Sequence, residues 1–276
     1  MIIAWLRGLL SRRLGRLLAV STGIALAVAL IAALGAFLTA SQSTMTARAL
    51  RSVAVDWQVE VQPGASPAVA LRQVVAAPDV TAALAVQFAA VNGFQATVGG
   101  TTQTTGAGEV LGLPPDYRTA FPQQIRTLTG ADTGVLLAQQ AAANLRVRPG
   151  DTIRIERAGR PATSVTVAGV VDLPLADTLF QKVGAQPQSQ PSAPPDNVLL
   201  LPSATFTQLL GNGPSTVQIH VARRAPVQSS PAAAYRVAVG AGHNLEAQLA
   251  GAGVVGNNVA AALDAARSDA AYAQML

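Results

Sequence analysis

The longest uncharged stretch of the chain is the feature that most constrains its fold. No charged residue occurs over the 24 positions from Leu17 to Ala40. As a helix this stretch would be about 36 Å long, and a bilayer core of about 30 Å needs roughly 20 helical residues. A cleaved signal peptide is the competing interpretation, but its apolar run is only about 7–15 residues and its cleavage site prefers small residues, whereas Leu38 occupies one such position. The sequence therefore favours an uncleaved transmembrane helix over residues 17–40.

The distribution of arginine predicts how this helix is oriented. Four arginines lie within the first sixteen residues: Arg7, Arg12, Arg13 and Arg16. On the other side, the first basic residues are Arg48 and Arg51. Because basic flanks stay on the cytoplasmic side, residues 1–16 are expected to be a cytoplasmic basic segment, amphipathic over residues 2–10. The chain after the helix is expected to be exported.

The composition argues against several classes of protein. A net charge of +5 could suggest nucleic-acid binding, but the arginines beyond the first sixteen residues are spread thinly and are not interleaved with aromatic residues. No nucleic-acid partner is therefore expected. The absence of cysteine excludes disulfides, thiolate metal sites and cysteine nucleophiles. Half of the residues are hydrophobic and 12% are charged, which does not fit a disordered chain.

Strand and helix patterns intermingle through the exported region. Alternating apolar and polar residues predict strands over residues 53–61 and 152–155. Further strands are expected over residues 83–90, 94–98, 108–113, 134–137, 164–171, 197–201 and 216–221. Helices are expected from Ser66-Pro67, from Pro202-Ser203 and over residues 256–276. Residues 181–197, rich in Pro, Gln and Ser, are expected to form a mobile loop. The lack of a regular βαβ period favours an α+β domain.

Glycine, lysine and histidine patterns do not indicate a cofactor or metal site. Gly251, Gly253 and Gly256 match the dinucleotide-binding string G-x-G-x-x-G, but a helical segment precedes it and no further strand follows. We interpret this segment as a flexible joint between two helices. The only lysine is Lys182, so there is no phosphate-binding loop of the G-x-x-x-x-G-K type. His220 in a strand pattern and His243 in a polar turn lack the further ligands that a metal requires.

The carboxylates do not form a catalytic arrangement in the sequence either. Asp151 follows Pro149-Gly150, and turn chemistry explains all three residues. Asp172, Asp177 and Asp196 flank loops without pairing. We therefore predict no catalytic, cofactor-binding or metal-binding residues, no cofactor, and no enzymatic activity. An anchored enzyme that depends on Asp151 or His220 is the alternative that mutation would test.

Four stretches resemble, in their order, the N-terminal half of FtsX-like and MacB-like ABC transporter permeases. Residues 110–113 (VLGL), followed by two prolines, are similar to a family strand that ends in proline. Residues 134–151 (GVLLAQQAAANLRVRPGD) are similar to the family's unit of strand, alanine-rich helix and Gly-Asp turn. Residues 165–171 (VTVAGVV) resemble the strand that follows, and residues 256–276 resemble a helical stalk that leads to a second membrane helix. The resemblance covers nearly the whole chain.

The resemblance implies a fold, a function and partners. The expected fold is one N-terminal transmembrane helix, an α+β extracytoplasmic domain of the MacB periplasmic-core type over residues 41–255, and the helical stalk. In this family a separate cytoplasmic ATPase hydrolyses ATP, and the permease passes the movement outward for export, lipoprotein release or hydrolase regulation. The implied partners are the lipid bilayer, a cytoplasmic ABC ATPase, and further permease helices or a second permease copy. The implied location is the bacterial plasma membrane, with the N-terminus in the cytoplasm.

The chain is also expected to be a portion of a longer or split permease. Permeases of this family carry at least three further membrane helices and a cytoplasmic coupling segment, which these 276 residues do not contain. The alternative function is a single-pass, membrane-anchored extracytoplasmic module that binds or assembles without an ATPase. An apolar run of about 20 residues following residue 276 would favour the permease.

Overall fold

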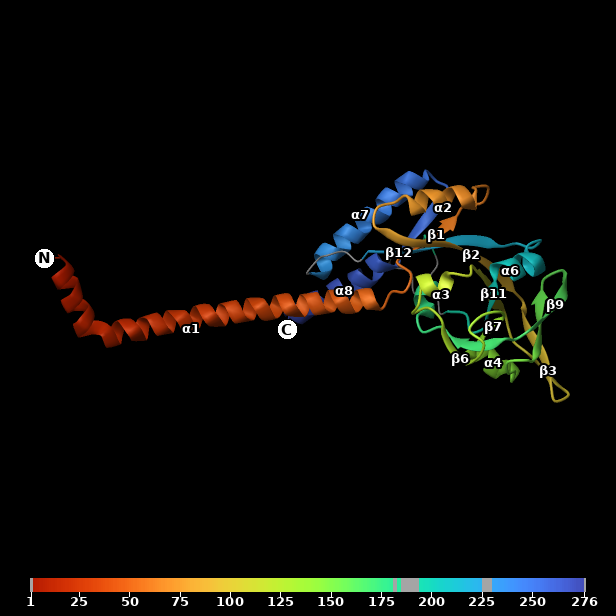
Figure 1. Ribbon diagram of the computed structural model, residues 1–276, viewed down its shortest axis with the longest axis horizontal. Coiled ribbons are helices and arrows are strands. Elements are labelled where there is room, and N and C mark those ends of the chain that lie inside the picture. Colours follow the sequence, from red (N-terminus) through yellow and green to blue (C-terminus); the bar gives the residue numbers. More distant parts are fainter. Residues whose placement is uncertain (1, 181–182, 185–193, 225–229, 276) are drawn as a thin grey trace.

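The computed structural model describes residues 2–180, 183–184, 194–224 and 230–275 of the chain. Helix α1 (Ile2–Arg51) projects from a domain that contains all other described elements, and its first turns bend away from the main helix axis (Figure 1). The helix continues past both ends of the uncharged stretch over residues 17–40. The basic start and the apolar stretch therefore share one helical backbone.

A mixed nine-stranded sheet forms the larger part of the domain. Its strands, in spatial order, are β13 (Gly253–Asn257), β1 (Trp57–Val61), β12 (Thr216–Arg223), β2 (Val80–Val91), β5 (Gly108–Leu113), β11 (Val198–Pro202), β7 (Leu136–Ala138), β10 (Gly169–Asp172) and β6 (Arg126–Gly130). The pairs β11–β5 and β10–β7 are parallel, and the other neighbours are antiparallel. A mixed sheet with interspersed helices confirms the predicted α+β class.

A second, antiparallel sheet packs with this one. It contains β4 (Thr101–Thr104), β3 (Gly93–Val98), β8 (Thr152–Arg157) and β9 (Arg160–Thr166), in that order. Alternate residues such as Phe94, Ile153 and Ile155 face inward and join a core cluster with helix α4 (Gln139–Leu145). Because side chains of a strand alternate between faces, the residues between them are left at the surface.

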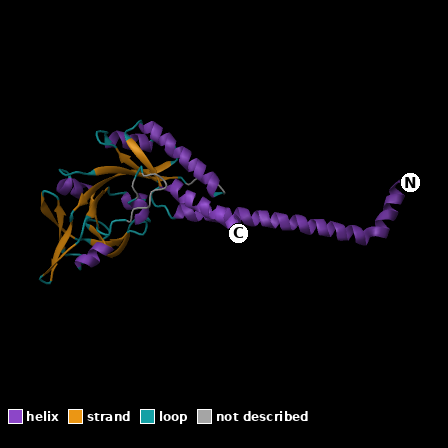
Figure 2. Cartoon of the chain, turned by 180° about the vertical axis from the view of Figure 1, so that it is seen from behind, coloured by secondary structure: helices purple, strands orange, loops and turns teal. Residues whose placement is uncertain are grey.

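Six further helices complete the fold: α2 (Pro67–Val75), α3 (Tyr117–Ala120), α5 (Ala176–Leu179), α6 (Ser203–Leu210), α7 (Pro231–Leu249) and α8 (Asn258–Met275). Helices α2 and α7 cover β1 and β12, where Trp57, Val59 and Leu245 are buried together. Helix α8 runs back along the end of α1, and both views show the two side by side (Figures 1 and 2). The stretch predicted as a helical stalk therefore returns toward the side from which the chain entered.

Two predicted local structures were wrong near the C-terminus. Residues 251–256 are not a flexible joint, because β13 pairs along its length with β1, with Val255 opposite Val59. Gly253 permits this pairing, since a Cβ there would lie 2.9 Å from Val59 Cγ1. His243 lies within α7 and not in a turn. Glycines near it weaken helix propensity, but the buried residues of α7, such as Leu245 and Leu249, hold it against the sheet.

One other prediction needs revision. Residues 164–171 form the end of β9 and, after a break, β10 in the other sheet, because Ala168 bonds Val135 and Ala131 there. The glycine- and threonine-rich loop over residues 99–108 contains β4, which folds back on β3 through Gly99 and Gly100 at positive φ. The predicted loop over residues 181–197 lies mostly outside the described residues.

Candidate functional site at the base of the stalk

Helix α1 presents a long apolar surface that the domain does not cover. Among the described side chains, the segment Gly15–Arg51 is the one helix long and apolar enough to cross a membrane, by length and composition. The large apolar side chains of this segment from Leu17 to Leu38 are between 47% and 72% exposed. Such a continuous exposed apolar surface is typical of a membrane or protein contact. It agrees with the predicted transmembrane helix.

The end of α1 that joins the domain packs in a three-helix cluster. The buried members are Val53, Ala234, Ala238, Val259, Ala260 and Leu263, and we call this set the stalk cluster. On α1, Ala49 and Leu50 pack against it, one turn before Val53. On α8, Val259 and Leu263 are four residues apart and face the same way. Helices α1 and α8 therefore share one small hydrophobic core with α7.

Two asparagines fix the start of α8. Asn257 Oδ1 accepts a hydrogen bond from Ala260 N at 2.9 Å, which is an N-cap, and its Nδ2 donates to Ala238 O at 2.8 Å. Asn258 is only 3% exposed, and its Nδ2 donates to Val55 O at 2.8 Å. Helix α8 is thus tied both to α7 and to the segment that follows α1.

Asp56 lies where β1, β12 and α8 meet. Its backbone oxygen accepts from Asn258 N at 3.1 Å, and its Oδ2 accepts from Arg223 N at 2.5 Å. Burial raises the pKa of Asp56 from 3.8 to about 6, although the bond from the Arg223 amide and the charge of that guanidinium oppose the change. The Arg223 guanidinium lies 3.9 Å from the centre of the Trp57 ring, a cation–π contact. We call residues 52–58 together with residues 257–259 the stalk junction.

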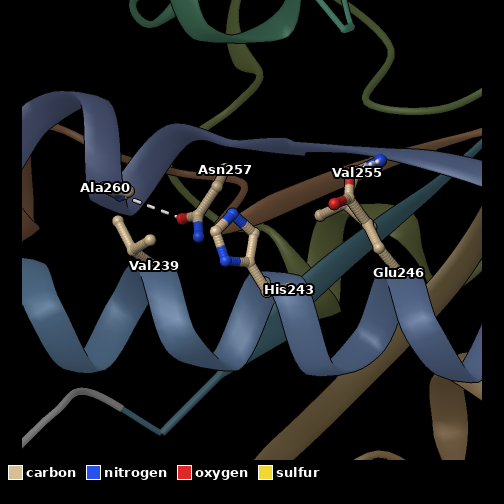
Figure 3. Close-up of a pocket in the computed structure, with 7 residues that line it drawn as sticks. Val239, His243, Glu246, Val255, Asn257 and Ala260 are labelled. Carbon is tan, nitrogen blue, oxygen red and sulfur yellow. Dashed lines mark hydrogen bonds between the residues drawn. The ribbon is translucent and has the colours of Figure 1, made fainter.

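A small pocket lies beside this junction. It has a volume of about 130 Å³ and is lined by Val239, Gly242, His243, Glu246, Val255, Asn257 and Ala260 (Figure 3). Glu246 Oε1 accepts from Val255 N at 3.3 Å on the edge strand β13. The side chain of Asn257 bonds the backbone of Ala260 and Ala238, as described above. His243 is exposed. The polar side chains other than His243 thus bond neighbouring backbone groups.

His220 is buried in an aromatic environment. Its Nδ1 lies 2.8 Å from Tyr117 Oη, and which atom donates depends on the tautomer. The rings of Phe88, Tyr117 and Phe121 surround it at 5.7 to 6.2 Å. Burial lowers the pKa of His220 from 6.5 to about 3 and raises the pKa of Tyr117. His220 is therefore a neutral core residue near neutral pH, remote in sequence and element from His243.

The predicted loop carboxylates lie in separate places. Asp151 Oδ2 accepts from Arg148 N at 2.7 Å, which is the turn chemistry expected of it. Asp172 pairs with Arg126 at 2.6 Å at the far edge of the large sheet. Asp177 on α5 and Asp196 before β11 are exposed. Within the described part of the chain, no group of three or more His, Asp or Glu residues is placed to hold a metal ion.

Sequence reasoning did not identify the junction residues. Asn257 could have been found, because an asparagine directly before a helical pattern is an N-cap signal. Asp56 and Asn258 could not, because the bonds that define their roles join residues about 200 positions apart. Lys182 lies outside the described residues.

Comparison with known proteins gives one family match. Residues 18–263 match the family model of the MacB-like periplasmic core domain. No curated protein matches the chain. Solved structures that are similar at low identity include the periplasmic region of MacB from Actinobacillus actinomycetemcomitans (10% identity, 76% of this chain and 92% of that one, TM-score 0.44) and the extracellular domain of the noncanonic ABC-type transporter YknZ from Gram-positive bacteria (13%, 72% and 100%, TM-score 0.41). With TM-scores below 0.5, the family assignment rests on the family model.

Proposed function

Because the chain belongs to the family of MacB-like periplasmic core domains, we propose that it is the N-terminal portion of an FtsX/MacB-type ABC transporter permease. In this role it transmits motion driven by a separate cytoplasmic ATPase to its extracytoplasmic domain. The purpose of that motion would be export, lipoprotein release or regulation of a hydrolase. The proposed location is the bacterial plasma membrane, with residues 1–16 in the cytoplasm.

The observation that carries this proposal is the convergence of α1 and α8 on the stalk junction. A membrane helix that served only as an anchor could join the domain through a loose linker. Here the end of α1 packs with α7 and α8 through Leu50, Val53 and Leu263, and Asn258 bonds the segment that follows α1. A displacement of either helix along its axis would therefore reach the sheet directly. This is the geometry that mechanical transmission requires.

Co-purification tests the ATPase partner. The full-length protein would be expressed together with any ABC ATPase encoded beside its gene, solubilised in mild detergent and captured through a tag on the permease. We expect a stoichiometric ATPase whose hydrolysis rate changes in the complex. Capture of the permease without any ATPase would favour the alternative, a single-pass anchored module for binding or assembly.

Cysteine labelling tests the orientation. The chain has no cysteine, so Ser11→Cys and the exposed Ser164→Cys each introduce a single thiol. A membrane-impermeant maleimide applied to intact spheroplasts should label the variant at residue 164 and should label the one at residue 11 only after lysis. The reverse pattern would contradict the proposed orientation.

We also propose that the chain has no catalytic activity of its own. The proposal is supported by the occupied turn role of Asp151 and by the burial of His220. The matched test is the purified protein with Asp151→Asn or His220→Gln. If the wild type turned over any substrate and a folded variant with either change did not, this part of the proposal would be overturned.

A further inference from the structure

The four-residue helix α5 has an unusual C-terminal end. The last carbonyls of a helix have no partner within it, and here two buried side chains from the stalk junction supply the donors. Asn258 Nδ2 donates to Thr178 O at 3.3 Å, and Gln58 Nε2 donates to Leu179 O at 2.6 Å. Gln58 is fully buried and Asn258 nearly so. Helix α5 is thus bonded by Gln58 and Asn258, two residues of the stalk junction.

Asn258 joins three elements at once. It is the first residue of α8, its backbone N donates to Asp56 O at 3.1 Å, and its side-chain amide contacts both Val55 O and Thr178 O. Its Nδ2 also lies 3.5 Å from Gln58 Oε1. A displacement of α8 or of the end of α1 therefore changes the positions of the groups that bond α5.

Two described residues that follow α5 contact strands beside the same junction. Phe180 packs edge-on against Phe88 with ring centres 6.4 Å apart. Val183 lies over β13, where a Cβ at Gly256 would be 3.4 Å from Val183 Cγ2. We call α5 with Phe180, Val183 and Gly184 the arm. Its apolar contacts can slide, since the hydrophobic effect is non-directional, whereas its hydrogen bonds to the junction are directional.

We propose that Asn258 is a coupling residue that makes the arm follow displacements of helices α1 and α8. The inference rests on the proposed mechanical function and names the route that motion takes out of the junction. Leaving a buried amide without its carbonyl partner is unfavourable, so α8 and α5 move together rather than separate. The arm is then a moving output of the junction between α1 and α8.

A double-mutant cycle read by hydrogen exchange tests this coupling. The whole chain is placed in lipid nanodiscs, and exchange is followed at the protected amides of Thr178, Leu179 and Phe180, which bond Leu175 and Ala176. Leu263→Ala loosens the stalk cluster at a distance from α5. With Asn258 present, we expect Leu263→Ala to speed exchange of the arm by about tenfold, as a shift of about 1.4 kcal/mol in opening would.

The same change in an Asn258→Ala background separates coupling from simple support. If Asn258 transmits the disturbance, Leu263→Ala should then alter exchange of the arm by less than about twofold. An equal factor in both backgrounds would mean that Asn258 is only a structural contact, and would overturn the proposal. Asn244→Ala, at an exposed position on α7, is the matched control and should leave the tenfold response intact.

A second route keeps the test decisive if Asn258→Ala does not fold. Gln58→Met is close in size and removes the donor to Leu179 O while leaving Asn258 in place. It should reduce the response of the arm to Leu263→Ala by about threefold. In a separate variant, Asn258→Gln keeps an amide donor and should retain part of the response that Asn258→Ala is expected to lose. A response unchanged by Gln58→Met would also overturn the coupling. No ATPase or nucleotide is used, so failure here and failure of the transporter proposal are distinguishable.

Discussion

Replacing Asp56 with asparagine should make the protein gain stability relative to wild type as the pH rises from about 4 to about 7. The carboxyl of Asp56 has its pKa raised from 3.8 to about 6 because it is buried at the stalk junction. Between these two values the folded protein holds a proton that the unfolded chain has released. The wild type therefore loses stability across this window as the pH rises, and the loss is complete above pH 6.

The magnitude follows from the same two values. A pKa moved from 3.8 to about 6, at about 1.4 kcal/mol for each pH unit, gives at most about 3 kcal/mol. Asp56 is partly exposed, so about 2 kcal/mol is expected after allowing for solvent screening. Asparagine keeps an oxygen that can accept from Arg223 N, and it carries no charge at any of these pH values. The pH-dependent loss should therefore disappear in the variant.

Tryptophan fluorescence offers a suitable assay. The chain has two tryptophans, Trp5 and Trp57, and Trp57 is 1% exposed and lies directly after Asp56. In a Trp5→Phe background, urea unfolding of the whole chain in nanodiscs would be followed at pH 4, 5, 6 and 7. Taking the difference between variant and wild type at each pH cancels the titration of all other groups.

The reasoning would be refuted if the stability of Asp56→Asn relative to wild type stayed constant with pH or fell as the pH rises. The first outcome would mean that Asp56 is as well solvated in the fold as in the unfolded chain. The second would mean that the Arg223 guanidinium outweighs burial and stabilises the carboxylate. The exposed Asp196→Asn variant controls for loss of one carboxylate away from the junction.

Three further outcomes follow from the structure. His220 has a pKa lowered from 6.5 to about 3 by burial, so the wild type loses stability as the pH falls through this window. In the same urea assay, the stability of His220→Gln relative to wild type should therefore rise as the pH falls. Leu263→Ala removes a fully buried side chain of the stalk cluster and should cost about 2–5 kcal/mol in urea unfolding, whereas the exposed Val237→Ala should change stability by under about 0.5 kcal/mol. Asn257→Ala removes the N-cap of α8 and should cost about 0.5–2 kcal/mol, with faster hydrogen exchange at the Ala260 amide as the specific sign.

Local features of the sequence were sufficient for the anchor and for much of the domain. The uncharged run from Leu17 to Ala40 predicts a membrane helix because spanning a bilayer requires about 20 consecutive apolar residues. The turn at Asp151 was predictable for the same reason, since its bond to Arg148 N spans three residues. Most strands of the two sheets were predictable from short apolar or alternating stretches, and their mixture with helices indicated the α+β class.

The tertiary structure alone decided the stalk junction. The glycines of β13 suggest a flexible joint, and only its pairing with β1, where Val255 lies opposite Val59 (255 − 59 = 196 positions apart), makes it a strand. In the same way, Asp56 has an ordinary aspartate sequence context, and its raised pKa comes from being enclosed by β12 and α8. Burial and hydrogen bonding depend on which distant segments meet, and a single sequence carries no local pattern for that. The site where helices α1 and α8 meet the sheet could therefore be identified only from the folded chain.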